Sequence, residues 1–139
     1  MKDDIIEYII NITDGDLRRS INLLQSVSQF SGDKISKQIV NDICGIIPDE
    51  EIANLFVKST LATPCEINRL IEDFLLEGFD ANQLLVQLLE YIINSKEVND
   101  NLKAAISFKI AQSERLMIES ANAHLVLTNL FCEIRKNYN

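Results

Sequence analysis

The amino-acid sequence predicts an all-α fold built from many helices, and three observations lead to this prediction. Apolar residues recur at intervals of three and four along most of the chain, which is the period of an amphipathic helix. Alternation of apolar and polar residues at period two, typical of half-buried strands, is nearly absent. The few Gly and Pro residues lie mostly between the periodic segments, where helices end. The pattern indicates about eight helices.

The first third of the chain favours short helices. Three are expected, and they cover about residues 3–12, 16–28 and 36–44. Gly32 lies in the predicted turn before the third helix, and Gly45 is the expected cap at its end. Pro48 closes this section because proline interrupts a helix. The acidic run 49–51 then favours the start of a new helix through its dipole. We therefore expect a boundary near residue 48.

The rest of the chain predicts longer helices that pack together. The clearest helix start is Thr63-Pro64-Cys65-Glu66, because the Thr and Glu can cap free amide groups and Pro suits the first turn. Gly78 is the expected end of this helix, and Asp80 the cap of the next. Two further apolar stripes run through residues 102–117 and 127–134. Together these segments predict a four-helix unit.

Composition and charge limit the classes of function. The 139 residues carry 13 Lys and Arg against 21 Asp and Glu, a net charge of −8, so the chain itself is expected to bind DNA poorly. The opening residues do not resemble a secretory leader, and the apolar runs are too short to span a membrane. The three Cys residues lie far apart, which fits a reducing compartment better than a disulfide framework or a zinc site.

Candidate catalytic groups find little support in the sequence. His124 is the single histidine and has no partner motif, so we expect a packing or surface role. Cys44 and Cys132 fall on or near apolar stripes and are expected to act as small core residues. The neighbours Glu72 and Asp73 point to different sides of a helix, which argues against a catalytic dyad. We assign no catalytic residue and no metal ligand.

The segment 15–25 is the most informative one, and it reads Gly-Asp-Leu-Arg-Arg-Ser-Ile-Asn-Leu-Leu-Gln. Periodicity alone predicts a capped amphipathic helix in which Leu17, Ile21 and Leu24 are buried and both arginines are solvated. The exact string closely resembles the sensor-2 helix of replication factor C small subunits, which are clamp-loader proteins of the AAA+ ATPase superfamily.

Two further segments carry the same resemblance, in the same order and spacing. Residues 40–48, Val-Asn-Asp-Ile-Cys-Gly-Ile-Ile-Pro, resemble the family's junction between lid and collar. Residues 75–79, Leu-Leu-Glu-Gly-Phe, followed by Gln83-Leu84, resemble its first collar hairpin. The resemblance thus covers essentially the whole chain. It implies that residues 1–47 are the end of the AAA+ lid domain and that residues 48–139 are a helical collar that assembles subunits into a ring.

The resemblance also implies roles for single residues. Arg18 would be the sensor-2 arginine, which contacts the γ-phosphate of ATP, whereas Arg19 would lie at a surface or interface. The sequence contains neither a Gly-x-x-x-x-Gly-Lys-Ser/Thr phosphate loop nor a Walker-B motif, so this chain alone is not expected to hydrolyse ATP. No cofactor is expected here, and ATP and Mg²⁺ would belong to a longer parent chain.

The partners implied by the resemblance are the other replication factor C subunits, bound through the collar. Exposed apolar residues on the outer faces of the last two helices would supply the contacts. The parent complex would load the sliding clamp (PCNA) onto primed DNA in the nucleus, and the chain alone is expected to self-associate weakly. A self-contained helical adaptor explains the helical periodicity equally well but not the motif at 15–25. A small metal or nucleophile enzyme lacks a supporting set of residues.

Overall fold

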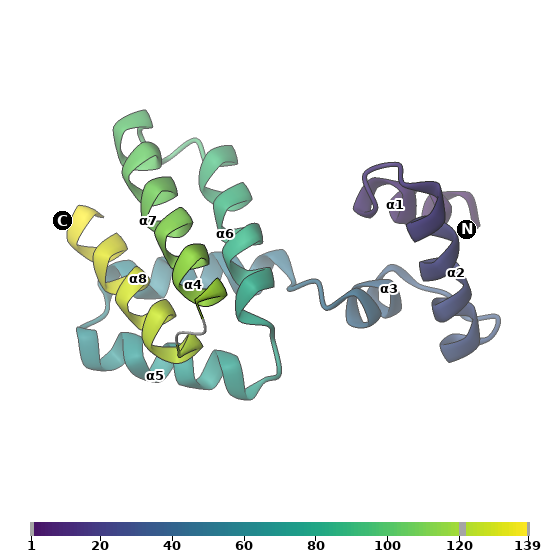
Figure 1. Ribbon diagram of the computed structural model, residues 1–139, viewed down its shortest axis with the longest axis horizontal. Coiled ribbons are helices and arrows are strands. Elements are labelled where there is room, and N and C mark those ends of the chain that lie inside the picture. Colours follow the sequence, from purple (N-terminus) through teal and green to yellow (C-terminus); the bar gives the residue numbers. More distant parts are fainter. Residues whose placement is uncertain (1, 120–121, 139) are drawn as a thin grey trace. The chain divides into compact units, whose positions relative to one another are not determined.

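The computed structural model describes residues 2–119 and 122–138, and within these ranges it contains eight α-helices and no strand. The predicted all-α fold is confirmed. Figure 1 shows the helices, which divide into two compact units. Unit 1 comprises Met1–Ile46 and unit 2 comprises Ile47–Asn139. Each unit has a cluster of buried apolar side chains of its own.

Unit 1 is a three-helix unit. Its helices are α1 (Lys2–Ile12), α2 (Leu17–Ser31) and α3 (Lys37–Cys44). The centre consists of four buried aliphatic side chains, Ile5, Ile9, Val27 and Val40. Gly45 ends α3 in the left-handed conformation, with φ of 69° and ψ of 23°, as its position in the sequence predicts. Every helix of unit 1 therefore contributes to one small core.

The turn between α1 and α2 is fixed by polar contacts. The hydroxyl groups of Thr13 and Ser20 are buried and hydrogen-bonded to each other. Ser20 Oγ also donates to the carbonyl oxygen of Asp16 at 2.8 Å, and the Asp16 carboxylate accepts the amide of Arg19 at 3.1 Å. Gly15 has a φ of +76°, a conformation that glycine adopts without steric cost. These contacts hold the first turn of α2 in a defined position.

One prediction for α2 is wrong. Leu17 and Ile21 were expected in the core, but their side chains are 72% and 47% exposed. Leu24 is half-buried and packs against the core of unit 1. Periodicity identifies the apolar face of a helix but not what covers that face. In the described part of unit 1, the first turns of α2 extend their apolar side beyond the three-helix core.

Unit 2 is a five-helix bundle rather than the predicted four-helix unit. Its helices are α4 (Asp49–Leu61), α5 (Pro64–Leu76), α6 (Ala81–Asn94), α7 (Asp100–Ile118) and α8 (Ala123–Tyr138). The additional helix is α4, which buries Ile52, Leu55 and Phe56 and packs against α6 and α8. The C-terminal helix α8 is central, because it packs against α4, α5 and α7. The chain therefore closes its larger core with its last helix.

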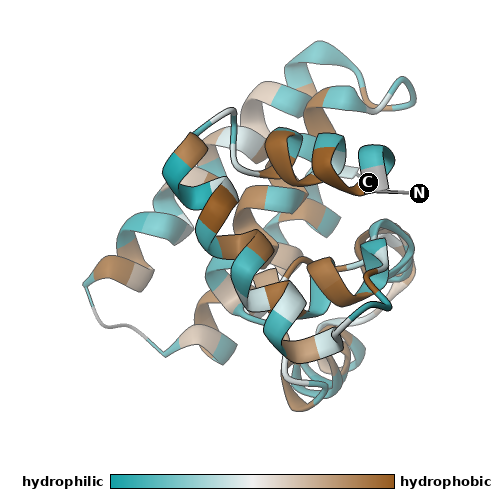
Figure 2. Ribbon diagram, turned by 90° about the vertical axis from the view of Figure 1, so that its right-hand side faces the viewer, coloured by the Kyte–Doolittle hydropathy of each residue, from teal (hydrophilic) through white to brown (hydrophobic). Residues whose placement is uncertain are grey.

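Amphipathic helices build this core. Figure 2 shows hydrophobic and hydrophilic residues interspersed along the helices of the chain, as helices with one buried face require. The core extends across all five helices and includes fully buried side chains such as Ile71, Leu88, Ile110 and Phe131. Phe56 makes edge-on contacts with Tyr91 and Tyr138, which join α4 to α6 and α8.

The predicted start of α5 is confirmed in detail. Thr63 Oγ1 accepts the amide of Glu66 at 3.4 Å, and the amide of Thr63 donates to Glu66 Oε2 at 2.6 Å. This reciprocal pair is a capping box, with Pro64 at the first helical position. The hydrogen bonds from Thr63 stabilise the carboxylate and lower the pKa of Glu66. Asp80 caps α6 in the same manner through the amide of Gln83, at 3.1 Å.

A side-chain clamp fixes the point at which unit 2 begins. The amide of Ile47 donates to Gln87 Oε1 at 2.9 Å, and Gln87 Nε2 donates to the carbonyl oxygen of Ile47 at 2.8 Å. Gln83 Nε2 also donates to Gln87 Oε1 at 2.9 Å, which orients the Gln87 side chain. Ile47 is fully buried in the core. The segment just before α4 is thus held on α6 by both polar and apolar contacts.

Candidate functional site

The predicted sensor residue lies at the start of α2. The structure places Arg18 in the first turn of this helix, two residues after the Asp16 cap, with an exposed side chain. Arg19 is also exposed, and its positive charge lowers the pKa of the Cys44 thiol of α3, which offsets part of the increase caused by burial. Successive helical residues are about 100° apart, so the two arginines point in different directions. The role of Arg18 toward a γ-phosphate stays a prediction.

An apolar groove lies on the other side of the same turn. It has a volume of about 140 Å³ and runs between α1 and α2, lined by Ile6, Ile9, Ile10, Leu17, Ser20, Ile21 and Leu24. Among the lining residues, Ile6, Ile10, Leu17 and Ile21 are each more than 40% exposed. Aliphatic side chains grouped in this way are typical of surfaces that another protein element covers. The arginine and the groove therefore share one helix but use different faces of it.

The outer surface of unit 2 also carries large apolar side chains. Helix α7 buries Ile106 and Ile110, while Phe108 on its opposite side is 62% exposed. Ala104 and Ala111 lie one helical turn before and after Phe108 and are exposed as well. Further exposed apolar side chains follow at the end of α7 and the start of α8: Leu116, Ile118 and Leu125. We call these six exposed residues, the two alanines included, the α7–α8 surface.

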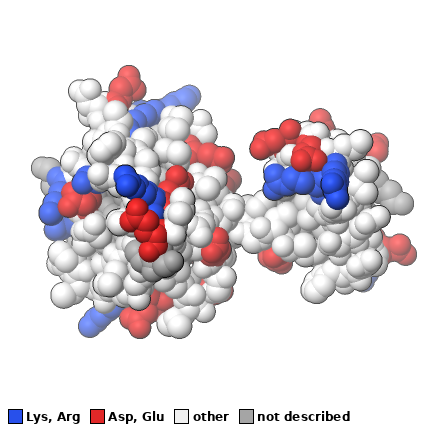
Figure 3. All heavy atoms as spheres, in the orientation of Figure 1, with Lys and Arg blue, Asp and Glu red and all other residues white. Residues whose placement is uncertain are grey.

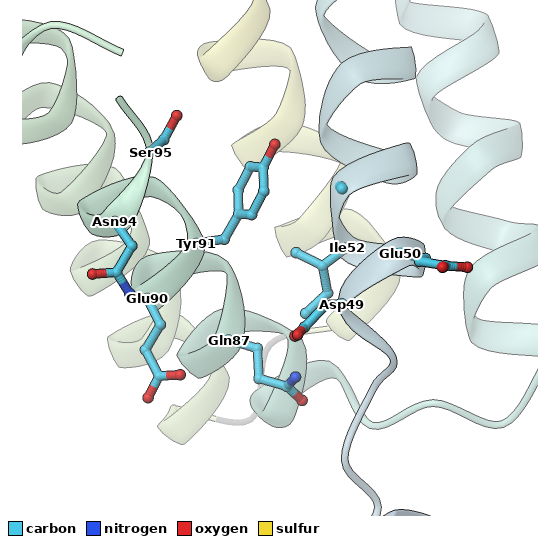
Figure 4. A pocket seen from close by; sticks show the side chains of 9 residues that line it. Asp49, Glu50, Ile52, Gln87, Glu90, Tyr91, Asn94 and Ser95 are labelled. Atoms are coloured by element: carbon cyan, nitrogen blue, oxygen red, sulfur yellow. The ribbon is translucent and has the colours of Figure 1, made fainter. Parts of the chain in front are cut away.

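A hollow of unit 2 lies between α4 and α6. Its volume is about 600 Å³, and Figure 4 shows the side chains that line it, among them Asp49, Glu50, Gln87, Glu90 and Tyr91. The Glu50 and Glu90 carboxylates point in different directions in this view. The Gln87 side-chain amide is already hydrogen-bonded to the backbone of Ile47. Glu50 and Glu90 therefore do not form a convergent acidic pair of the kind that acid–base catalysis uses.

The remaining chemistry-bearing residues are also dispersed. His124 is half-buried, and its Nε2 lies 3.4 Å from the carbonyl oxygen of Asn68, so it bridges α8 and α5. Cys44 and Cys132 pack against the two cores, and burial raises the pKa of both thiols. Cys65 is exposed. Within residues 2–119 and 122–138, no group of three His, Cys, Asp or Glu side chains is arranged to hold a metal ion.

Charges of both signs lie on the face of the molecule that Figure 3 shows. Figure 3 shows basic side chains on the visible face of unit 1 next to acidic ones, and mixed charges separated by uncharged surface on unit 2. Both ion pairs found among the described residues are exposed and local, Arg115 with Glu119 and Lys136 with Glu133. Such pairs contribute little to stability. None of the described helices is both long and apolar enough to cross a membrane.

A completed helical core with large apolar side chains on its outside is typical of domains that pack against other proteins. Comparison with known proteins leads to the same class of domain. Residues 47–133 match the family described as replication factor C C-terminal domain, and this match covers more than half of the chain. The chain therefore belongs to the replication factor C family. Membership does not favour the alternative of a self-contained helical adaptor.

Individual relatives extend the similarity to unit 1. The chain is 30% identical over 131 residues to replication factor C subunit 4 of Homo sapiens, covering 94% of this chain and 36% of that protein. It is 31% identical over 137 residues to replication factor C subunit 2 of Saccharomyces cerevisiae, covering 95% and 39%. For the replication factor C small subunit of Methanocaldococcus jannaschii, identity is 25% over 130 residues, covering 93% and 7%. The chain spans little more than a third of the first two relatives.

Sequence reasoning missed two features of the site. The Gln87 clamp joins residues that are 40 positions apart, and glutamine within an apolar stripe carries no signal for such a contact. The groove of unit 1 was also missed, because Leu17, Ile21 and Leu24 of its lining were expected to lie in the core. Four isoleucines at positions 5, 6, 9 and 10 are more than one face of α1 can bury, and this excess was the available signal.

Proposed function

We propose that the chain is the C-terminal part of a clamp-loader subunit, in which unit 2 is the collar that joins neighbouring subunits into a ring. The observation that carries this proposal is the α7–α8 surface on a unit whose own core is already complete. An exposed Phe108 between two alanines gives a neighbouring helix close access and an aromatic anchor. The family match over residues 47–133 supports the same assignment.

Unit 1 would be the end of the AAA+ lid domain in the longer protein. In this proposal Arg18 reaches the γ-phosphate of ATP bound by the rest of the subunit, and Mg²⁺ belongs to that nucleotide site. A guanidinium group is a permanent cation with forked donors that match phosphate oxygens. The exposed position of Arg18 at the start of α2 leaves it accessible for such a contact. The lid could then report whether ATP or ADP is bound.

The activity of the whole assembly follows from these two assignments. The complex would use ATP to place the sliding clamp (PCNA) on primer-template DNA during replication, in the nucleus of a eukaryotic cell. With a net charge of −8, this chain would contribute assembly rather than DNA affinity. Clamp and DNA would be contacted through the other parts of the complex.

Co-expression with the other replication factor C subunits of the same organism tests the collar assignment. The tagged chain should recover neighbouring subunits in stoichiometric amounts, and Phe108→Asp should reduce this recovery at least about tenfold because it places a charge in a dry contact. Phe30→Asp is the matched control, because Phe30 is 79% exposed but lies in unit 1. Equal recovery with Phe108→Asp would remove the α7–α8 surface from the proposal.

The assignment of Arg18 is tested in the longer protein. Arg18→Gln should lower ATP-dependent clamp loading about a hundredfold or more, because a charged contact to phosphate is lost. Arg19→Gln is the neighbouring control and should leave loading within about twofold of the wild type. A larger loss for Arg19→Gln than for Arg18→Gln would reverse the assignment.

A further inference from the structure

A ring of similar subunits needs two different surfaces on each subunit, because head-to-tail contacts pair one face with another. The inference below rests on the proposed collar function, which places one of these faces on α7 and α8. The main contacts of α7 are with α6 and α8, whereas those of α5 are with α4 and α8. The exposed sides of α4 and α5 are therefore a separate surface of unit 2.

This second surface lies along α4 and α5. It consists of two hollows of about 450 and 210 Å³, which share Lys58, Leu70 and Asp73 in their walls. We call the combined feature the α4–α5 groove. Its full lining is Glu51, Asn54, Leu55, Lys58, Leu61, Ala62, Glu66, Arg69, Leu70, Asp73, Phe74 and Glu77. A groove between two helices is the usual receptor for a partner helix.

The floor of the groove is apolar. Leu55 and Phe74 are only 6% and 5% exposed and close it from below, and Leu70 is half-buried. Leu61, the last residue of α4, is 83% exposed at one end of the groove. Covering these side chains would remove apolar surface from water, the main favourable contribution in most protein association. The groove therefore favours a partner with at least one apolar anchor.

The rim of the groove carries more acidic than basic groups. Four carboxylates stand against two cations, Lys58 and Arg69, which leaves a net charge of −2 at the groove. Glu66 is engaged in the capping box, but Glu51, Asp73 and Glu77 form no ion pair with a residue in the described ranges. These three carboxylates are therefore available to basic side chains of a partner.

We propose that the α4–α5 groove is the second assembly surface of the collar and binds a helix of a neighbouring subunit that presents an apolar side chain flanked by Lys or Arg. The apolar anchor would lie on Leu61 and Leu70, and the basic side chains would reach Asp73 and Glu77. With this groove and the α7–α8 surface, each collar has two faces of different chemistry, so that neighbours bind in one order.

Photo-crosslinking identifies the occupant directly. Leu61 of the tagged chain is replaced by the photo-reactive residue benzoylphenylalanine. The chain is co-expressed with the other replication factor C subunits, and the complex is irradiated. We expect a crosslink to one neighbouring subunit, at a helical segment with Lys or Arg within one turn of the attached residue. The same probe in place of Phe30 is the control and should not attach to that segment. A crosslink to an acidic or uncharged segment would overturn the stated chemistry.

Charge reversal supplies an independent readout. Asp73→Lys combined with Glu77→Lys should lower recovery of the crosslinked neighbour at least about tenfold, because like charges then face each other. The matched control is Asp3→Lys with Asp4→Lys, which makes the same change of net charge on α1 and should not alter recovery. Helix content of each variant is checked by circular dichroism.

The outcomes separate this inference from the collar assignment. If the folded wild-type chain recovers no replication factor C subunit, the proposed function fails and the groove loses its partner. If the wild-type chain recovers neighbours while Leu61 forms no crosslink and the charge reversal has no effect, the collar assignment stands and the groove is excluded as an assembly surface.

Discussion

Units 1 and 2 leave apolar side chains exposed for different physical reasons. Unit 1 has four fully or nearly buried aliphatic residues at its centre, whereas the core of unit 2 contains twenty buried residues. A chain as short as Met1–Ile46 buries a small share of its surface and is marginal alone. The exposed Ile6, Leu17 and Ile21 lie next to this small core, so covering them would complete it.

In unit 2 the exposed apolar residues lie outside a core that is already closed. Phe108 faces outward from α7 while Ile106 and Ile110 of the same helix are fully buried. Covering Phe108 would thus create an interface rather than finish a fold. Exposure alone therefore does not identify an assembly surface, because exposed apolar residues can also belong to an incomplete core beneath them.

The largest expected effect comes from the core of unit 2. Phe131 is fully buried in the central helix α8, so Phe131→Ala should lower the free energy of unfolding of unit 2 by about 3–5 kcal/mol. Urea unfolding followed by circular dichroism measures the loss. Backbone NMR signals of α1–α3 should stay unchanged, since the two cores are separate. Loss of the unit 1 signals together with those of unit 2 would show that the cores depend on each other.

The core of unit 1 provides the second test. Ile9 is 2% exposed, and Ile9→Ala should cost about 2 kcal/mol, which is a large part of the stability of so small a unit. Hydrogen exchange should become rapid throughout α1–α3 and stay slow in α4–α8. Continued slow exchange in α1–α3 would contradict our view that unit 1 is marginal.

The Gln87 clamp is expected to have a smaller effect. Gln87→Leu removes both hydrogen bonds to the backbone of Ile47 and should lower the stability of unit 2 by about 1–2 kcal/mol. Gln83→Ala is the control, because it keeps both bonds to Ile47 and should cost less. If the two variants were equally stable, Gln87 would not hold the start of unit 2.

The smallest effect concerns the capping box at α5. Thr63→Ala should lower stability by about 1 kcal/mol, the usual cost of losing an N-cap side chain. Folding lowers the pKa of Glu66, so its contribution is present above the ordinary value of 4.5 and is lost as pH falls through the lower folded pKa. An NMR titration should give a midpoint below 4.5 that rises only part of the way toward this value in Thr63→Ala, because the backbone amide of residue 63 still donates to Glu66. A midpoint of 4.5 in the wild-type protein would contradict the capping contact.

The sequence predicts local features well and distant ones poorly. The all-α class and the Thr63–Glu66 capping box depend on neighbouring residues, whose spacing is visible in the sequence. The prediction that Leu17 is buried was wrong, because burial depends on which element covers a helix face. The contribution of α4 to the bundle and the pairing of Ile47 with Gln87 were missed for the same reason, since both arise from contacts between segments far apart in the chain.

The candidate sites differ in the same manner. Arg18 was selected from a family motif, and its expected partner is a nucleotide phosphate rather than another residue of the chain, so the structure gives its position but not its role. The α7–α8 surface follows from the expectation that the last two helices expose apolar residues, and Phe108 and Leu125 are indeed exposed. The α4–α5 groove required the packed bundle, because no single helix contains it.

Hydrogen exchange of the chain, free and bound to the other replication factor C subunits, tests the central claim most directly. If unit 2 is the collar, binding should slow exchange in α7 and α8 while α1–α3 continue to exchange at their free rates. Slower exchange confined to α1–α3, with α7 and α8 unchanged, would show that unit 1 makes the contacts and would contradict the collar assignment.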